Sequence, residues 1–376
     1  MDLNFTETQL ILRKTAREFC ELECPPSLVR AMETHPEGHS VELWHKIVQM
    51  GWLGVFVPAE YGGHGGGFLD LLILLHEMGR SALPGPFFAT TVFGGTAIME
   101  GGSIEQKREL LPRLADGQLL ITIALSEPGI DFGLDHLNTA VVQRNGHHFV
   151  TGTKVFVPNA HISDLLLCIT AGTGLSSQVE NEVVLVGRTD PGVTLTAIRT
   201  NLPDRQFEVA LTDVRARYRL GNGEDARPWM QRVLEKAMVA KCAEMIGAGQ
   251  KLLEMTVEHA KVRVQFDRPI GSLQAVQHHC ANIAVCLDTA ELMTYRAGWN
   301  IEQRLPCRRE ALRAKAWTNE ACNQVAALAH QIHGGTGFMR EHDLHIFSRQ
   351  LLTSAHLFGG TGWCRRQIAR EIGLPM

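Results

Sequence analysis

The hydrophobic pattern of this chain changes its period twice, and the order of the patterns limits the folds that it can adopt. Residues 1–120 carry apolar side chains at helical spacing, and the same spacing returns over 226–376. Residues 121–225 are instead rich in β-forming runs separated by Gly, Pro and Asp. We therefore predict a mainly α protein with a central β-domain, in the order N-terminal helical domain, small β-barrel or sandwich domain and C-terminal four-helix bundle.

The clearest local signal within the central zone is a β-hairpin. Two β-rich runs, Thr139–Gln143 and His148–Val157, flank the dipeptide Asn145-Gly146. These two residue types tolerate the positive φ angles of a type I′ turn, which matches the twist of paired strands. Further strands are expected between turn residues at Val183–Val186, Val193–Thr196 and Phe207–Leu211.

The helical zones carry their own signals. Thr6 followed by Gln9 predicts a capping box at the start of the first helix. The loop GGHGGG at 62–67 has no strand before it and no Lys-Ser/Thr after it, so we interpret it as a plain loop and not as a phosphate cradle. In the last zone one helix presents an apolar face, and similar patterns follow over 274–302, 308–332 and 343–370. That face consists of Met238, Cys242, Met245, Ile246, Gly249 and Leu253.

Composition and charge exclude several classes of protein. The chain has 376 residues, 45% of them hydrophobic and 20% charged, as in ordinary globular proteins. Its formal net charge of −4 provides no basic footprint for nucleic acid or an anionic membrane. The local basic cluster of Arg308, Arg309, Arg313 and Lys315 is interpreted as a solvated helix face. No apolar run is long enough for a membrane span or a signal peptide, so we expect a cytoplasmic protein.

The nine cysteines are scattered, and none forms a C-x-x-C pair. Cys20 and Cys24 lie one helical turn apart, a spacing that a metal could use. Neither a second close pair nor a spaced His partner accompanies them. We therefore predict reduced thiols in the core and no metal site.

Five segments, in order along the chain, resemble the acyl-CoA dehydrogenase family. GWLGVFVPAEYGGHGG (51–66) is similar to its N-terminal signature, ALSEPG (124–129) to the motif that opens its β-domain, and GTKVFVPNA (152–160) to the strand behind its flavin. RVQFDRPIGSLQAVQ (263–277) resembles the segment that reaches across a subunit interface in that family, and QIHGGTGF (331–338) the glycine turn that completes the flavin site. The resemblance spans essentially the whole chain and implies the fold of that family.

The resemblance also implies FAD as cofactor, and the chemistry of the matching residues suits that ligand. Arg263 supplies a fixed cation for a diphosphate, and neighbouring Gln side chains supply amide donors. Phe266 can pack on an aromatic face, while Gly334 and Gly335 let the backbone approach a ligand closely. The implied cofactor-binding residues are Leu125, Ser126, Phe156, Pro158, Arg263, Gln265, Phe266, Ile270, Gln274, Gln331, Ile332, Gly334 and Gly335.

Two positions depart from the family pattern around the flavin. Pro158 stands where the family usually has a Thr or Ser that donates near the flavin N5, and Pro has neither N–H nor hydroxyl. Asp131-Phe132-Gly133 replaces a Gly-Ser-Asp loop that normally touches the flavin phosphate and the acyl-CoA. We expect these changes to alter the tuning of the ring and the seating of the substrate.

The residue that the family uses as catalytic base is missing. In the implied reaction a Glu removes the α-proton of an acyl-CoA thioester while the β-hydrogen leaves as hydride to the flavin. One family position for this Glu is occupied by Phe358, or by Gly359 if the alignment slips by one residue. The other, 26 residues before Arg263, is Ala237.

Four ionisable residues of the chain bear on the question of a replacement for the base. Glu235 is turned about 200° around the helix from Ala237, and Glu244 lies about 10.5 Å further along its axis. Glu244 is a weak candidate, because an ion pair with Lys241 is the simpler reading. Glu127 is read as structural and His333 as a packing histidine.

Three hypotheses follow. The first is an FAD-dependent acyl-CoA dehydrogenase subunit in a homo- or hetero-oligomer, with a displaced base or one lent by a homologous chain, and with an electron-transfer flavoprotein as acceptor. The second is a catalytically silent structural or regulatory partner of an active homologue. The third, nitro-compound or hydroxylation chemistry on the same fold, often uses an Asp at the base position, and none is present. The acyl group of the substrate is not predictable from the chain.

Overall fold

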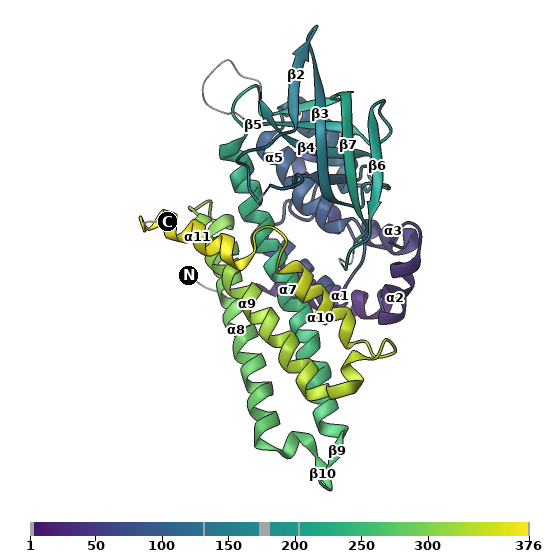
Figure 1. Ribbon diagram of the computed structural model, residues 1–376, viewed down its shortest axis with the longest axis vertical. Coiled ribbons are helices and arrows are strands. Elements are labelled where there is room, and N and C mark those ends of the chain that lie inside the picture. The colour runs from purple at the N-terminus through teal and green to yellow at the C-terminus, as the bar shows by residue number, and fades with distance from the viewer. Residues whose placement is uncertain (1–3, 131, 173–180, 202–203, 375–376) are drawn as a thin grey trace. The chain divides into compact units, whose positions relative to one another are not determined.

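The computed structural model describes residues 4–130, 132–172, 181–201 and 204–374 (Figure 1). Its contacts divide the chain into two compact units, which are described separately. The bundle unit comprises Met1–Ala31, Phe68–Leu83 and Met238–Met376. The sheet unit comprises Met32–Gly67 and Pro84–Ala237.

The sheet unit is built on one eight-stranded sheet in the order β6-β7-β3-β2-β4-β5-β8, with β1 paired to β4. The β1–β4 and β2–β4 pairs are parallel, and the other pairs are antiparallel. Val150, Leu166, Val184 and Val209 have no exposed surface and belong to its core. The strands are β1 Ile121–Ala124, β2 Ala140–Arg144, β3 His147–Pro158, β4 Leu165–Gly172, β5 Asn181–Gly187, β6 Val193–Ile198, β7 Gln206–Arg215 and β8 Tyr218–Leu220.

The predicted hairpin is confirmed. β2 and β3 pair antiparallel from Arg144↔His147 outward, and Asn145 and Gly146 adopt φ angles of 51° and 78°. Both positive values are those of a type I′ turn. The strands predicted within β5, β6 and β7 are also confirmed, whereas β4 was not predicted. Its sequence LLLCITAG is an unbroken apolar run, which is the pattern of a strand buried on both faces and carries no alternation.

Short helices accompany the sheet within the same unit. They are α3 Val41–Gln49, η1 Trp52–Gly54, η2 Ala59–Tyr61, the π-helical η3 Phe88–Gly95, α5 Thr96–Gly101 and α6 Ile104–Ala115. The GGHGGG segment is confirmed as a loop, and its amides bond its own chain: His64 donates to the Gly54 carbonyl at 2.9 Å and Gly66 to the Val55 carbonyl at 2.8 Å. Both amides are therefore committed to the turn and do not point at a ligand.

The bundle unit contains three long helices, α7, α8 and α9, which run side by side in Figure 1. α7 begins in the sheet unit and belongs to the bundle unit from Met238. The predicted capping box is confirmed, because the Thr6 hydroxyl and the Gln9 side chain each accept from the other residue's backbone amide. The helices are α1 Glu7–Glu23, α2 Pro26–Thr34 (its residues up to Ala31), α4 Phe68–Arg80, α7 Arg227–Val262, α8 Gln274–Glu302, α9 Arg308–His333, α10 Leu344–Ser354 and α11 Thr361–Glu371.

Two expectations for this unit are wrong. The pattern over 343–370 forms two helices, α10 and α11, because Phe358 and Gly359 adopt φ angles of 55° and 103° that no helix contains. Lys315 is also not on a solvated face: its side chain has no exposed surface, while Arg309 and Arg313 on the same helix are exposed. The helical period places residue 315 on the opposite face from its basic neighbours.

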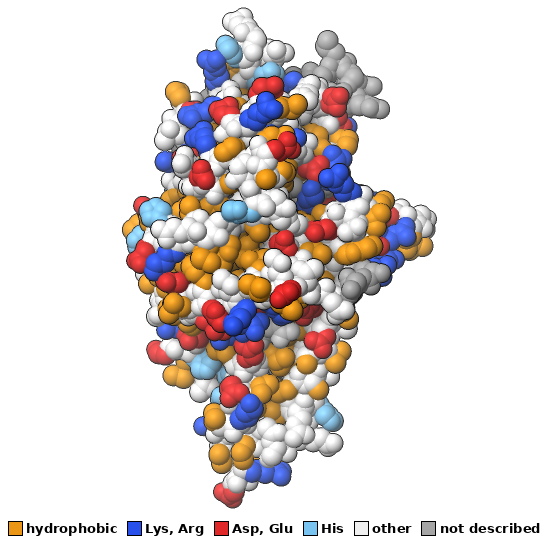
Figure 2. Space-filling view, turned by 180° about the vertical axis from the view of Figure 1, so that it is seen from behind, with side chains coloured by type: hydrophobic (Ala, Val, Ile, Leu, Met, Phe, Trp, Pro, Cys, Tyr) orange, Lys and Arg blue, Asp and Glu red, His pale blue; other side chains and the backbone are white. Residues whose placement is uncertain are grey.

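Charge and length give two further observations. On the face shown in Figure 2, basic and acidic side chains are interspersed, in keeping with the formal net charge of −4. Among the helices of the described residues, none combines the length and the apolar character needed to cross a bilayer.

The nine cysteines are free thiols, eight of them buried and Cys280 partly exposed.

Candidate active site

The flavin residues predicted in the sheet unit follow β1 and lie on β3. The Val155 amide donates to the Ser126 carbonyl at 2.9 Å, which ties the segment after β1 to β3. One residue further, the β3–β7 register shifts between Lys154 and Val157. Within this irregularity Phe156 adopts a φ angle of 54°, and 52% of its surface is exposed. A positive φ is costly for a bulky residue, and here it accompanies an aromatic ring that is turned outward as an exposed platform.

A buried ion pair fixes the backbone beside this platform. Lys154 Nζ lies 2.6 Å from Glu127 Oε1, with 0% and 1% of the two side chains exposed. The Glu127 carboxylate also accepts from the backbone amides of Asn138 and Thr139 at 2.6 and 3.0 Å. Burial alone would raise the pKa of Glu127, but the ammonium of Lys154 and these amides hold that pKa below its usual range. Glu127 is thus structural, as predicted, and every oxygen is committed.

One of the departures from the family pattern lies on the same strand. Pro158 ends β3, and its carbonyl accepts from the Thr122 hydroxyl. It therefore stabilises the sheet and offers no donor to a ligand. In the segment Asp131-Phe132-Gly133, Asp131 lies outside the described residues.

In the bundle unit, a short hairpin presents Arg263, Gln265 and Phe266. β9 (Val264–Gln265) pairs with β10 (Arg268–Pro269), and the Ile270 amide donates to the Arg263 carbonyl at 2.8 Å. Phe266 occupies a turn position with φ 54° and is 82% exposed. The Arg263 guanidinium is exposed and makes no hydrogen bond or ion pair with any described residue. The hairpin thereby presents a cation and an aromatic ring for which the described residues provide no side-chain partner.

The glycine turn lies in the same unit, at the end of α9. Gly334 has a φ angle of 59°, which favours glycine, and η5 (Gly334–Phe338) follows it. A Cβ built on Gly334 or Gly335 would meet no described atom within 4 Å, so the space beside this turn is open. Gln331 on α9 and Gln274 at the start of α8 are exposed amides. Ile332 is buried and Ile270 is partly exposed.

This set of residues fits a flavin dinucleotide. An unpaired guanidinium suits a diphosphate, exposed amides suit its polar edges, and an open glycine turn leaves room for the ligand to approach. Within its own unit, each of the exposed rings of Phe156 and Phe266 presents a face on which a planar ring can pack. The described residues bind none of these groups, apart from the Gln265 side chain, which donates to the Val264 carbonyl at 2.9 Å.

A group of histidines that the sequence did not reveal packs beneath the glycine turn. His333 stacks on His259 at 4.4 Å between ring centroids and meets His342 edge-on at 5.1 Å. Its Nδ1 lies 2.8 Å from the Ala329 carbonyl, so this nitrogen carries the proton. Burial lowers the pKa of His333 to about 4, and the ring is neutral at pH 7. His333 is therefore a buried packing residue, as predicted, although its Nε2 has no partner in the described chain.

At the positions where the family carries its base, the chain has no carboxylate. Glu235, two residues before Ala237, is buried and accepts from Gln231 Nε2 at 3.3 Å. Phe358 is partly exposed in the turn between α10 and α11, and Ala237 is fully buried. Glu244 is occupied: its Oε2 lies 2.7 Å from Lys241 Nζ, and its Oε1 accepts from Gln350 Nε2 at 3.1 Å. The ion pair with Lys241 was predicted and is confirmed.

Side chains of α9 hold the turn that carries Phe358 through hydrogen bonds to its backbone. Lys315 Nζ donates to the Ser354 carbonyl at 3.1 Å and to Asn319 Oδ1 at 2.5 Å, and Asn319 Nδ2 donates to the Gly359 carbonyl at 3.2 Å. Burial lowers the pKa of Lys315 to about 8. Sequence reasoning missed this arrangement because Lys315 resembles its exposed basic neighbours in composition.

Similarity to known proteins agrees with the motifs. The model described as "Acyl-CoA dehydrogenase, N-terminal domain" matches residues 6–118, and "Acyl-CoA dehydrogenase, C-terminal domain" matches 228–373. The chain is 31% identical to the acyl-CoA dehydrogenase fadE12 of Mycobacterium tuberculosis, over 85% of this chain and 83% of that protein. The chain belongs to the acyl-CoA dehydrogenase family.

Solved structures of the family share the fold of this chain. A variant of the Tcur3481–Tcur3483 steroid ACAD superposes with a TM-score of 0.88 at 29% identity, covering 97% of this chain and 98% of that one. The ChsE4–ChsE5 complex of Mycobacterium tuberculosis gives a TM-score of 0.88 at 25% identity, with both chains fully covered. Each of these two relatives is named as a pair of chains. Within the described residues, no group of three or more His, Cys, Asp or Glu is placed to hold a metal.

Proposed function

We propose that this protein is one subunit of an FAD-dependent acyl-CoA dehydrogenase that introduces an α,β double bond into an acyl-CoA thioester. Acyl-CoA dehydrogenases are oxidoreductases that act on CH–CH bonds, and members of the family depend on FAD. The observation that carries the proposal is the exposed group of Arg263, Gln274, Gln331 and the open Gly334–Gly335 turn, which the described chain leaves free for a ligand.

Each of these residues has a definite role toward the cofactor. Arg263 neutralises the diphosphate, and the amides of Gln274 and Gln331 donate to its oxygens. Phe156 and Phe266 offer aromatic faces to planar rings. When bound, FAD supplies the acceptor for the β-hydrogen of the substrate. Pro158 offers no donor near the ring, so the ring environment differs from that of relatives with a hydroxyl there.

The α-proton requires a base that this chain does not place at the expected positions. Glu127 and Glu244 are committed to Lys154 and Lys241, and neither is free to accept a proton without breaking its ion pair. We therefore favour a base lent by a homologous partner chain, with an electron-transfer flavoprotein as the electron acceptor. The pairing of chains in the two solved relatives supports this arrangement.

The proposal is tested by flavin content and flavin reduction. The chain is purified alone and co-expressed with a homologous chain encoded beside it, and the visible spectrum is recorded during additions of an acyl-CoA panel. We expect bound flavin and bleaching by at least one thioester in the co-expressed sample. Absence of flavin in both samples, or absence of bleaching across the panel in both, contradicts the proposal.

A matched pair of variants identifies the flavin cation. Arg263→Met should lower the flavin occupancy at least tenfold, because a buried or partly buried diphosphate needs a compensating charge. Arg268→Met removes the same charge from the opposite strand of the same hairpin, where register pairs Arg268 with Gln265. We expect Arg268→Met to retain flavin. Equal losses in both variants would count against the assigned role of Arg263.

A second function, a catalytically silent partner, is favoured by one observation. Phe358, Gly359 and Ala237 provide no base, and Pro158 provides no donor to the ring. If the co-expressed complex turns over substrate, a Phe266→Ala change in this chain distinguishes the two functions. Loss of flavin from the complex assigns a cofactor role to this chain, whereas unchanged flavin and turnover support the silent role.

A further inference from the structure

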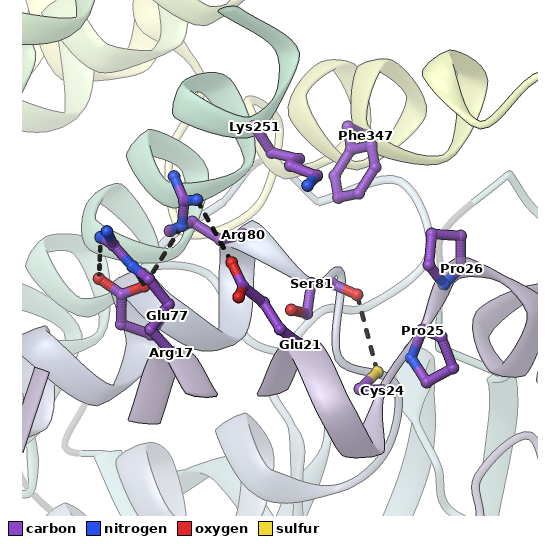
Figure 3. A pocket seen from close by; sticks show the side chains of 10 residues that line it. All are labelled: Arg17, Glu21, Cys24, Pro25, Pro26, Glu77, Arg80, Ser81, Lys251 and Phe347. Atoms are coloured by element: carbon purple, nitrogen blue, oxygen red, sulfur yellow. Dashed lines mark hydrogen bonds and ion pairs between the residues drawn. The ribbon is translucent and has the colours of Figure 1, made fainter. Parts of the chain in front are cut away.

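A cavity of about 190 Å³ lies within the bundle unit, between α1, α4, α7 and α10 (Figure 3). It shares no residue with the predicted flavin set. The lining residues are Arg17, Glu21, Cys24, Pro25, Pro26, Glu77, Arg80, Ser81, Lys251 and Phe347.

Among the described residues around this cavity, the ion pairs use the acidic side chains and leave one basic side chain unpaired. Glu77, with 0% of its side chain exposed, is bound by Arg13, Arg17 and Arg80 at 3.2, 2.9 and 3.3 Å. Arg80 in turn holds Glu254 through two hydrogen bonds of 2.7 and 2.9 Å. Because Glu254 is engaged by Arg80, the carboxylate one turn from Lys251 on α7 is already taken.

Lys251 is the charge that has no partner among the described residues. Its ammonium makes no hydrogen bond or ion pair with any residue in the part of the chain that the structure describes. Figure 3 shows its side chain beside Phe347, on the far side of the cavity from Glu77. An ammonium at the edge of a narrow cavity attracts an anion more strongly than one in open water, since the protein wall lowers the local dielectric.

The rest of the lining selects the kind of anion. Cys24, Pro25, Pro26 and Phe347 provide the apolar part of the lining, with Phe347 beside Lys251. Glu21 and Glu77 also face the cavity and repel a second negative charge. We propose that this cavity binds a small monocarboxylate with a short aliphatic body, its carboxylate on Lys251 and its chain against Phe347 and the two prolines.

The inference is tested by titrating the purified chain, as isolated, with hexanoate and with hexanamide under isothermal titration calorimetry. The two probes match in shape and differ in charge. We expect saturable binding of hexanoate at one site per chain and at least tenfold weaker binding of hexanamide. Equal binding of the two probes, or no saturable binding of hexanoate in the millimolar range, overturns the proposal.

Two lysine variants on one helix assign the site. Lys251→Met should weaken hexanoate at least tenfold and leave hexanamide unchanged, while Lys251→Arg should retain binding. Lys261→Met is the matched control: Lys261 lies on the same helix, is 62% exposed and pairs with Glu258 at 2.6 Å. Equal effects of Lys251→Met and Lys261→Met on hexanoate would refute the site.

The outcome is separable from the proposed function. The cavity and the flavin set have no residue in common, so hexanoate affinity should be the same before and after removal of flavin and in the presence of excess CoA. Displacement of hexanoate by CoA would assign it to the thioester site and overturn the inference. If neither the chain purified alone nor the co-expressed sample holds flavin, yet hexanoate still binds, the cavity is supported and only the proposed function is contradicted.

Discussion

Phe358 lies where the resemblance places the catalytic base, and contacts to the next residue help to hold the turn around it. Its φ angle of 55° precedes Gly359, whose carbonyl accepts from Asn319 Nδ2 at 3.2 Å. The Cys364 thiol reaches the same carbonyl at 3.6 Å. Because these contacts involve backbone oxygen, they survive a change of the side chain at 358.

Replacing this side chain with a carboxylate should therefore create a base in place. Phe358→Glu is expected to speed acyl-CoA-dependent bleaching of flavin at least tenfold over the parent chain, since a positioned general base contributes about 10²–10⁴ in rate. Stopped-flow absorbance measures the rate. Phe358→Gln is the isosteric control without a basic oxygen, and equal rates for the Glu and Gln variants would show that residue 358 does not face the substrate.

Lys315 offers a second test at the residue scale. Lys315→Met keeps much of the volume but removes the donors to the Ser354 carbonyl and to Asn319. We expect faster amide hydrogen exchange over 355–360, because a buried carbonyl without its donor loses about 1–3 kcal/mol of stabilisation. Arg313→Met, on the exposed face of the same helix, should leave that exchange unchanged.

Among the elements, α1 and α4 are joined by the buried carboxylate of Glu77. Its three guanidinium partners come from Arg13 and Arg17 on α1 and from Arg80 on α4. Glu77→Gln leaves these cations without their shared counter-charge, and we expect a loss of about 3–5 kcal/mol in the free energy of unfolding. Denaturant titration measures it. Glu18→Gln breaks an exposed pair with Lys14 on α1 and should cost less than about 1 kcal/mol.

The end of α9 should be sensitive to acid. Burial lowers the pKa of His333 to about 4, and it also lowers the pKa values of His259 and His330. In the unfolded chain these rings bind protons near pH 6.5. As the pH falls from about 6.5 toward 4, these histidines bind protons in the unfolded state but not in the folded state. The free energy of unfolding therefore decreases over that pH range.

This acid sensitivity is measurable by thermal melting between pH 7 and pH 4. For His333 alone the loss is on the order of 2–3 kcal/mol at pH 4 relative to pH 7. His333→Leu removes the titrating ring from the stack and should flatten the pH dependence. A variant that melts with the same pH dependence as the parent would show that other groups carry the effect.

For the whole molecule, the sequence predicts the order of helical and β zones well, because that order rests on hydrophobic period. Thr6–Gln9, Asn145-Gly146 and the apolar face of α7 are local signals, and the structure confirms them. What could not be predicted depends on contacts distant in sequence. Lys154 meets Glu127 across 27 residues, and the two stacked histidines His259 and His333 lie 74 residues apart.

For the candidate site, too, some features could be predicted from the sequence and others could not. The family motifs name residues that a ligand needs, such as Arg263 and the Gly334–Gly335 turn, and the structure shows these groups exposed and uncommitted. The motifs do not reveal the backbone conformation of Phe156 or Phe358, because a positive φ in a bulky residue is imposed by surrounding pairs and not by its own preference.

Assembly is the prediction that belongs to the complete molecule. Phe266 and Phe338 expose 82% and 74% of their surface, more than a soluble chain normally leaves at two large aromatic residues. Native mass spectrometry should show at least a dimer, and Phe266→Asp should increase the monomer fraction. Leu22→Asp, at a position 76% exposed on α1, is the control and should leave the mass distribution unchanged.

The buried pair of Glu127 and Lys154 has a consequence for the descent of this protein. Either residue replaced alone leaves a charge in the core beside the Leu125 and Ile169 carbonyls that Lys154 also reaches. During evolution, a single substitution at position 358 can therefore remove a catalytic base without disturbing the core. Glu127 and Lys154, by contrast, can be exchanged only together. We expect sequence alignments to show positions 127 and 154 varying in concert, and to show them surviving in branches where the chemistry has been abandoned.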